Sequence, residues 1–295
     1  MAGSTRVVWT LYGLVALAIV VTYSRVPPDQ LYHVSRDGLA GGLGRALVFA
    51  NWPVALVAPT VAAIAADRLH ARVATAVAVL GVALCAVILW PGVVEQRDLD
   101  AKLVNVVPAF GVAVVIALSL ATRDRRRPLG AAKAGAVLGL AVLSIPWLAA
   151  ELGAHVGLGV FLSGEPRVHG ADHRPHAAVH LGDHHGFAGV LLVVTALLLW
   201  PTLAEMRGRR LREVTRAYLG LMVAYGLVNA ANDFWLEQVV KRGWSKREIP
   251  GAVEPHLTPI WGAILLLAAT IVAIDLLRTR RRRQREGGGQ AIIAT

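Results

Sequence analysis

Charge and cysteine are both scarce in this sequence. Only 17% of the 295 residues are charged, whereas soluble domains usually carry about 25%. Cys85 is the single cysteine, so no intramolecular disulfide can form and no CxxC pair exists for redox chemistry or a thiolate zinc site. The sequence also lacks a P-loop, a dinucleotide-binding GxGxxG, an HExxH motif and a GxSxG elbow. These absences exclude a disulfide-rich secreted domain and give no sign of ATP, NAD or serine-hydrolase chemistry.

Apolar residues are abundant instead, and they are gathered into long blocks. They make up 56% of the chain, and the mean hydropathy is +0.56. A helix needs about 20 apolar residues to cross a bilayer, and lipid offers no partner for an open backbone. Eight blocks fit this description, at residues 7–23, 46–66, 73–93, 104–121, 134–162, 187–203, 217–239 and 259–277. The sequence therefore predicts an all-α, polytopic integral membrane bundle of about eight transmembrane helices.

The remaining segments are short, so a single transmembrane helical domain is expected over residues 1–278. Residues 279–295 are expected to form a disordered basic cytoplasmic tail, because arginines and then three glycines follow the last block. The first block is too long for a signal-peptide core and is interpreted as a retained span. Pro53 and Pro146 predict kinks in the second and fifth blocks.

Basic residues predict the orientation of the bundle. The N-terminus, the tail and every second connection carry 19 of the 30 Lys and Arg residues, and the alternate connections carry 11. The positive-inside bias places both termini in the cytoplasm of a multi-pass cell-membrane protein. The arginine runs at 123–127 and 280–283 thus indicate topology and contact with the lipid bilayer rather than nucleic acid. The bias toward Ala, Val and Arg suggests a bacterial source.

Histidine is concentrated in one connection. Seven of the ten histidines fall between positions 155 and 185, in a loop expected to face outside. His176, His180 and His184 are spaced i, i+4, i+8, so they would line one face of a helix leading into the sixth span. His185 would point about 100° away from His184 on such a helix and need not serve the same metal.

Carboxylates flank this loop at two other helix ends. Glu151 and His155 are four residues apart near the end of the fifth span, and Asp233 and Glu237 are four apart near the end of the seventh. An acid at membrane depth is costly unless it is paired, protonated or metal-bound. Imidazoles and carboxylates together suit zinc or iron, and imidazole also suits copper.

These residues form the predicted site. Glu151 and Asp233 are the candidate catalytic residues. The candidate ligands of a divalent metal (zinc, iron or copper) are His155, His176, His180, His184, His185, Glu151, Asp233 and Glu237.

Three functions compete for this pattern. The first is a metal-dependent membrane enzyme, a hydrolase or an oxidase/hydroxylase, with its site at the outer leaflet and a lipid-like or apolar substrate. The second is a copper- or zinc-binding or transport protein, and the third is a non-catalytic scaffold subunit. The third and fourth spans are almost wholly apolar, which favours a site on one side of the membrane over a path through it.

Simpler interpretations of the same residues stay open. The histidine loop could be a solvated tract that binds metal weakly, or a sensor of acid pH. Glu151 and Asp233 could form structural ion pairs with Arg174 or Lys241.

Overall fold

The fold was analysed in a computed structural model, which describes residues 4–122, 129–155, 166–168, 175–177, 179–254 and 258–292. Apart from one pair of three-residue strands, the regular structure in these ranges is helical, so the all-α prediction is confirmed. The helices are α1 Ser4–Arg25, α2 Gly38–Phe49, α3 Ala55–Leu69, α4 Arg72–Cys85, α5 Val106–Leu120, α6 Ala131–Leu143, α7 Ile145–Glu151, α8 His185–Leu199, α9 Arg209–Trp235 and α10 Pro259–Ile292. The strands β1 (Pro166–Val168) and β2 (Pro175–Ala177) pair antiparallel.

Six helical segments are long and apolar enough to cross a membrane, and the bent pair α6–α7 makes a seventh if it is counted as one span. The six segments are Ser4–Arg25, Gly38–Leu69, Arg72–Leu89, Leu103–Leu120, His185–Ala204 and Pro259–Arg281. The expected seventh block lies in α9, which is not among them. Asn229, Asn232 and Asp233 make the second half of this helix polar, and these residues belong to the site described below.

Large apolar side chains cover the outside of the bundle. Leu14, Val79, Leu138 and Leu266 are each more than half exposed, on four different helices. A water-soluble monomer rarely exposes so much apolar surface. Together with the spanning helices, this surface indicates a membrane protein.

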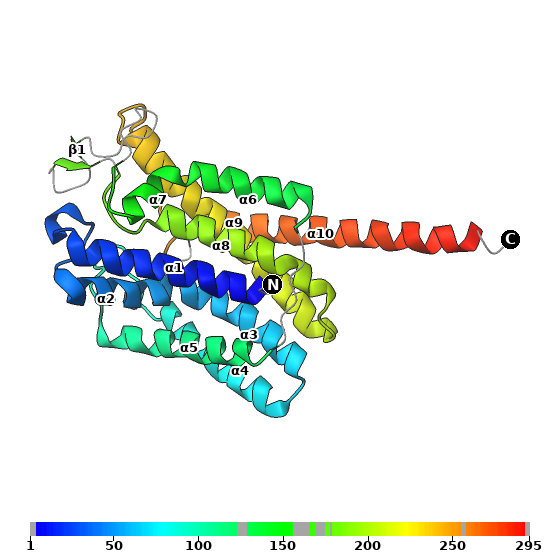
Figure 1. Cartoon of the computed structure of the whole chain (residues 1–295). Coiled ribbons are helices and arrows are strands. Elements are labelled where there is room, and N and C mark those ends of the chain that lie inside the picture. The colour runs from blue at the N-terminus through cyan, green and yellow to red at the C-terminus, as the bar shows by residue number, and fades with distance from the viewer. Residues whose placement is uncertain are drawn as a thin grey trace.

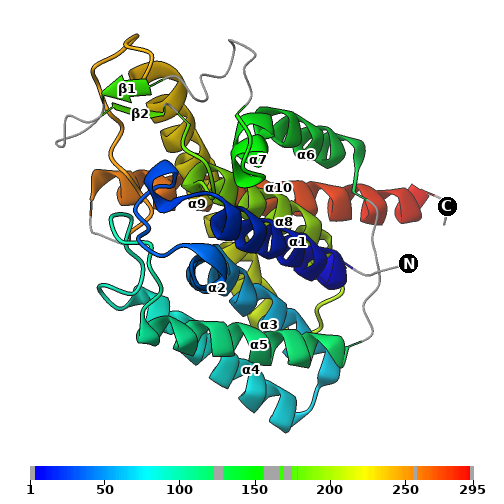
Figure 2. The ribbon, with the colours of Figure 1, turned by 60° about the vertical axis from the view of Figure 1, so that its left-hand side comes forward.

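The centre of the bundle is α8, which packs closely against α9 (Figures 1 and 2). In the apolar window of α8, 67% of the residues are buried, compared with 11% in that of α10. Gly189 and Gly226 make the close approach possible, because a Cβ on either glycine would lie 2.5 Å from the carbonyl oxygen of the other. Small residues commonly bring membrane helices together in this way.

Two spans are interrupted where the sequence contains proline. A π-helical turn at Ala50–Val54, in which Trp52 has non-helical dihedral angles, connects α2 to α3. The fifth block bends by 57° between α6 and α7, and its helix ends at Glu151, so it is shorter than predicted. At the C-terminal end, α10 continues from the last apolar block through the arginine run to Ile292. Arginine, glutamine and glutamate favour helix up to Glu286.

The described parts of the histidine-rich connection, β1, β2 and the residues directly before α8, lie at the end of the bundle away from the N-terminus (Figure 1). The predicted helix through His176, His180 and His184 is wrong: His176 lies in β2, and α8 begins only at His185. Gly182 has a φ of +96°, which a right-handed helix cannot contain, and a Cβ there would collide with the Tyr23 ring. A parallel bridge between Leu31 and Leu181 further fixes the extended backbone before α8.

Candidate metal centre

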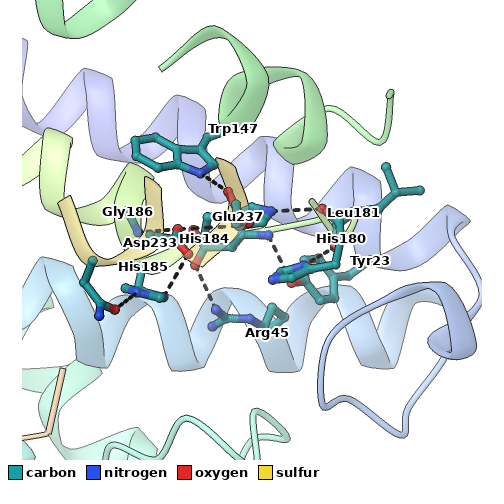
Figure 3. Close-up of polar contacts among 12 residues, drawn as sticks. Tyr23, Arg45, Trp147, His180, Leu181, His184, His185, Gly186, Asp233 and Glu237 are labelled. Atoms are coloured by element: carbon teal, nitrogen blue, oxygen red, sulfur yellow. Dashed lines mark hydrogen bonds and ion pairs between the residues drawn. The ribbon is translucent and has the colours of Figure 1, made fainter. Parts of the chain in front are cut away.

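Three buried side chains from two parts of the chain converge beside the start of α8 (Figure 3). Nδ1 of His184 lies 3.0 Å from Oε1 of Glu237 and 3.6 Å from Oδ2 of Asp233. One ligand atom from each residue lies within 4.8 Å of the others, which is close enough for all three to hold one metal ion. We call His184, Asp233 and Glu237 the metal group.

The helices that pack most closely also position this group. His184 is the residue directly before α8, and Asp233 lies in the last turn of α9. Glu237 follows four residues later, in a π-helical turn at Leu236–Val240, so both acids face the start of α8. Single π-turns of this kind are frequent at functional sites. The predicted i, i+4 pairing of Asp233 with Glu237 thus places both carboxylates near one imidazole.

The hydrogen bond that Nε2 of His184 makes leaves Nδ1 as the nitrogen that could bind a metal ion. Its Nε2 lies 2.9 Å from the carbonyl oxygen of His180, which can only accept, so Nε2 carries the proton. Nδ1 is buried and faces the carboxylates of Glu237 and Asp233. A lone pair that faces two carboxylates in a buried site is unfavourable unless a cation, either a proton or a metal ion, lies between them.

His185, like His184, directs its Nδ1 at Asp233. Its Nε2 donates to Oδ1 of Asn232 at 3.0 Å, and Asn232 is oriented because its Nδ2 donates to the carbonyl of Ile249. Nδ1 of His185 then lies 3.5 Å from Oδ1 of Asp233. Because helix α8 starts at His185, the two neighbouring histidines are not on one regular helix and both reach Asp233.

Both carboxylates are held by groups that act only as donors. Nε1 of Trp147, on α7, donates to Oε2 of Glu237 at 2.7 Å and leaves Oε1 directed at His184. The backbone N–H of Gly186 donates to Oδ2 of Asp233 at 2.8 Å. Partners of this kind orient metal ligands and commonly change metal affinity by about 10–100-fold.

The protonation of the histidines differs with their surroundings. Burial disfavours the charged form of His184, but Glu237 and Asp233 outweigh it and raise its pKa well above the usual value. Burial lowers the pKa of His180 well below the usual value, and the neighbouring His184 lowers it further. The ring of His180 stacks on that of His184 with centroids 3.9 Å apart, and its Nδ1 bonds to the carbonyl of Leu181. Its Nε2 is therefore left as an acceptor.

A buried ion pair adjoins the metal group. Nη2 of Arg45, on α2, lies 2.8 Å from Oδ2 of Asp183, and the guanidinium lies over the ring of Tyr23. Burial raises the pKa of Asp183 although Arg45 counteracts it. The Tyr23 hydroxyl accepts a hydrogen bond from the backbone of Asp183. Nε and Nη1 of Arg45 are buried and have no hydrogen-bond partner.

These groups open into one cavity of about 440 Å³. Arg45, His180, His185, Asp233 and Glu237 line it, and Trp52 lies on its wall. The cavity therefore combines candidate metal ligands with a guanidinium.

The predicted site residues fall into three sets. The structure brings together His184, His185, Asp233 and Glu237, with His180 stacked beside them. Glu151 is buried beside the carboxyl group of Asp183 and lies outside the metal group. His155 is exposed and is not part of the group, and the side chain of His176 lies outside the described residues.

Sequence reasoning missed Arg45, Asp183 and Trp147. Arg45 stands next to an apolar block, where a charge should have a partner. Asp183 lies within the histidine-rich segment, directly before His184, and this position is the one signal in the sequence for a counter-ion.

One histidine and two carboxylates, with a second histidine nearby, form a nitrogen and oxygen donor set that suits zinc, iron or manganese. The buried metal group could hold such an ion. No family model, curated protein or solved structure matches this chain, so the geometry of the site carries the functional argument.

Proposed function

We propose that this protein is a metal-dependent membrane hydrolase that acts on a lipid-like substrate. The observation that carries the proposal is the buried Nδ1 of His184, which lies 3.0 Å from Glu237 and 3.6 Å from Asp233, so that a proton or a metal ion must lie between them. A divalent cation would satisfy all three groups at once. Hydrolysis is the reaction class that needs nothing besides water, metal and substrate, whereas oxygenation also needs oxygen and an electron donor.

The residues around the metal group would have different roles in this reaction. His184, Asp233 and Glu237 would hold the metal, and His185 would supply a fourth ligand or orient Asp233. A bound divalent metal lowers the pKa of its water and polarises a carbonyl or phosphoryl oxygen. His180 lines the cavity, and its Nε2 would accept a hydrogen bond from the substrate or from water.

A one-sided site is preferred over a transport path. On α8 and α9, most of the buried residues beyond the metal group toward the opposite end are apolar, and among the few polar ones are Thr195 and Asn229. A path for ions would need polar groups to continue through this region. The apolar interior therefore supports catalysis at one membrane face over transfer of the metal across it.

We further propose that the site faces the outside of the cell. The N-terminus, the tail and the connections at the opposite end of the bundle together carry 19 of the 30 Lys and Arg residues, and such basic segments are retained in the cytoplasm. The metal group would then lie at the outer leaflet, where substrates can reach it sideways from the lipid.

Elemental analysis of the purified protein in detergent tests the metal. One divalent ion per chain is expected in the wild type, with its loss in His184→Ala. His155→Ala is the matched control, because this exposed histidine lies outside the group. A wild-type protein that stays metal-free after incubation with zinc, iron(II) and manganese would refute the metal centre.

Measurements of hydrolysis and of metal uptake distinguish an enzyme from a metal transporter. Chelator-treated protein should lose hydrolysis of long-chain nitrophenyl esters and alkyl phosphates, and regain it with the metal identified by elemental analysis. Metal uptake into proteoliposomes, with no hydrolysis of either class, would replace the enzyme by a transporter.

A further inference from the structure

A second, apolar cavity adjoins the polar one. It has a volume of about 480 Å³ and lies between α3, α4, α8, α9 and the start of α10. Leu56, Val82 and Leu192 are among its apolar walls. The two tyrosines on its wall present only their rings, because the hydroxyl of Tyr218 donates to the carbonyl of Leu56 and that of Tyr225 to the carbonyl of Val253.

The two cavities share part of their lining. Trp52, Val94 and Val253 border both of them. Nε1 of Trp52 donates to the Tyr225 hydroxyl at 2.9 Å, so the indole is fixed between the two spaces with its polar atom satisfied. A polar space beside the metal group therefore continues into an apolar one across a common wall.

The apolar cavity also reaches the lipid-facing surface. Leu89, at its border, is 63% exposed, and Leu56 and Pro59 are half-buried. An apolar chain could enter from the membrane without passing through water.

The polar cavity contains a buried arginine that could bind an anion. Arg45 is only 6% exposed, and one of its nitrogens is used by Asp183. Nε and Nη1 have no partner, and leaving such buried donors unsatisfied is costly. Guanidinium donors match the oxygens of a phosphate or a carboxylate in a two-point contact. Carboxylates also line this cavity, among them Asp233 and Glu237, so an oxyanion would have to sit close to Arg45, where the unused donors could offset their repulsion.

We propose that the substrate is an anionic amphiphile with a single apolar chain. Its phosphate or carboxylate headgroup contacts Arg45 beside the metal group, and its chain lies in the apolar cavity next to Trp52. Conversion of this amphiphile rests on the proposed hydrolase function, whereas its binding requires only Arg45 and the two cavities.

Binding of defined ligands tests this proposal. Dodecyl phosphate, dodecyl maltoside and inorganic phosphate are titrated against the full-length protein in amphipol, with intrinsic tryptophan fluorescence as the readout. Dodecyl phosphate should bind at least about tenfold more tightly than either partial ligand, since only it satisfies Arg45 and fills the apolar cavity. Laurate in place of dodecyl phosphate distinguishes a carboxylate headgroup from a phosphate.

Variants assign the two ends of the ligand. Arg45→Lys keeps the charge beside Asp183 but loses the two-point contact, and it should weaken dodecyl phosphate about tenfold. Arg36→Gln is the control, because Arg36 is exposed in the neighbouring connection. Val82→Trp should fill the apolar cavity and abolish the advantage of a dodecyl over an octyl chain. Val79→Trp, on the exposed side of the same helix, should not.

The outcomes separate this inference from the metal centre, because metal content is measured in the same samples. Tight binding of dodecyl phosphate that depends on Arg45 and Val82, in a protein without metal, upholds the ligand site and refutes the hydrolase. Stoichiometric metal with equal affinity for dodecyl phosphate and dodecyl maltoside overturns the ligand site alone. Unchanged affinities in both Arg45→Lys and Val82→Trp also overturn it.

Discussion

The indole of Trp147 and the carboxylate of Glu237 form a 2.7 Å hydrogen bond between α7 and the π-helical turn that follows α9. Trp147 is only 3% exposed. This contact leaves one oxygen of Glu237 directed at His184, so the orientation of the metal group depends on a residue that cannot bind metal itself.

Trp147→Phe should therefore weaken metal binding while the fold is retained. The lost hydrogen bond frees Glu237 to rotate, and the affinity for metal should fall about 10–100-fold. Competition with a fluorescent chelator measures this change. Trp9→Phe is the matched control, because Trp9 makes a similar hydrogen bond to Ser119 outside the metal group. Equal metal affinity in both variants would remove Trp147 from the support of the site.

Metal binding should also release protons. Burial disfavours the charged form of His184, but Glu237 and Asp233 outweigh it and raise its pKa well above its usual value, which favours an extra proton on this ring in the metal-free protein. The metal must displace that proton, so affinity should rise about tenfold per pH unit below the raised pKa and level off above it. Calorimetry in buffers of different ionisation enthalpy counts the proton released. An affinity independent of pH between about pH 6 and 8 would contradict a protonated His184.

The ion pair of Arg45 with Asp183 is expected to respond unequally to single and double substitution. Asp183→Leu leaves a buried guanidinium unpaired and should lower the free energy of unfolding by about 3–5 kcal/mol. Arg45→Met/Asp183→Leu removes both charges and should regain most of that loss. Thermal unfolding in detergent measures both. A double variant as unstable as Asp183→Leu would show that the charge pair is not the cause.

The contact of Gly189 with Gly226 should control assembly of the site. A leucine at position 226 would push α9 away from α8, because even a Cβ there meets a backbone oxygen at 2.5 Å. Gly226→Leu should lower both thermal stability and metal content. Gly139→Leu, on α6 where a Cβ meets nothing within 4 Å, is the control. Full metal content in Gly226→Leu would show that the site does not need this close packing.

Orientation can be tested with single cysteines. Cys85 is 1% exposed and should give little background labelling. Gln30→Cys should react with a membrane-impermeant maleimide on intact cells, and Ala71→Cys, at the opposite end of the bundle, only after permeabilisation. The reverse pattern would place the metal group in the cytoplasm.

Hydropathy was sufficient to predict the all-α bundle and most of its spans, because the bilayer imposes length and helical structure on apolar segments. Hydropathy was less successful at α9, which contains polar site residues, and at the fifth span, which is bent. The polar residues of α9 lower its hydropathy, and Pro146 shortens the fifth span by bending it.

The candidate site was predicted in composition but not in geometry. The i, i+4 spacing of Asp233 and Glu237 survives because it lies on helical backbone. The same spacing of His180 and His184 had no such basis, since Gly182 takes a positive φ and keeps this stretch extended. Contacts such as Arg45 with Asp183 connect positions 138 residues apart, and no local pattern encodes them.

The polar cavity draws its walls from distant parts of the polypeptide, from Arg45 on α2 to Val253 beyond α9. A ribosome must therefore deliver nearly the whole chain into the bilayer before the cavity can exist. The three residues of the metal group, by contrast, are all present once Glu237 has been added. A chain that stops between Glu237 and Val253 would therefore contain every proposed ligand and still lack part of the cavity wall.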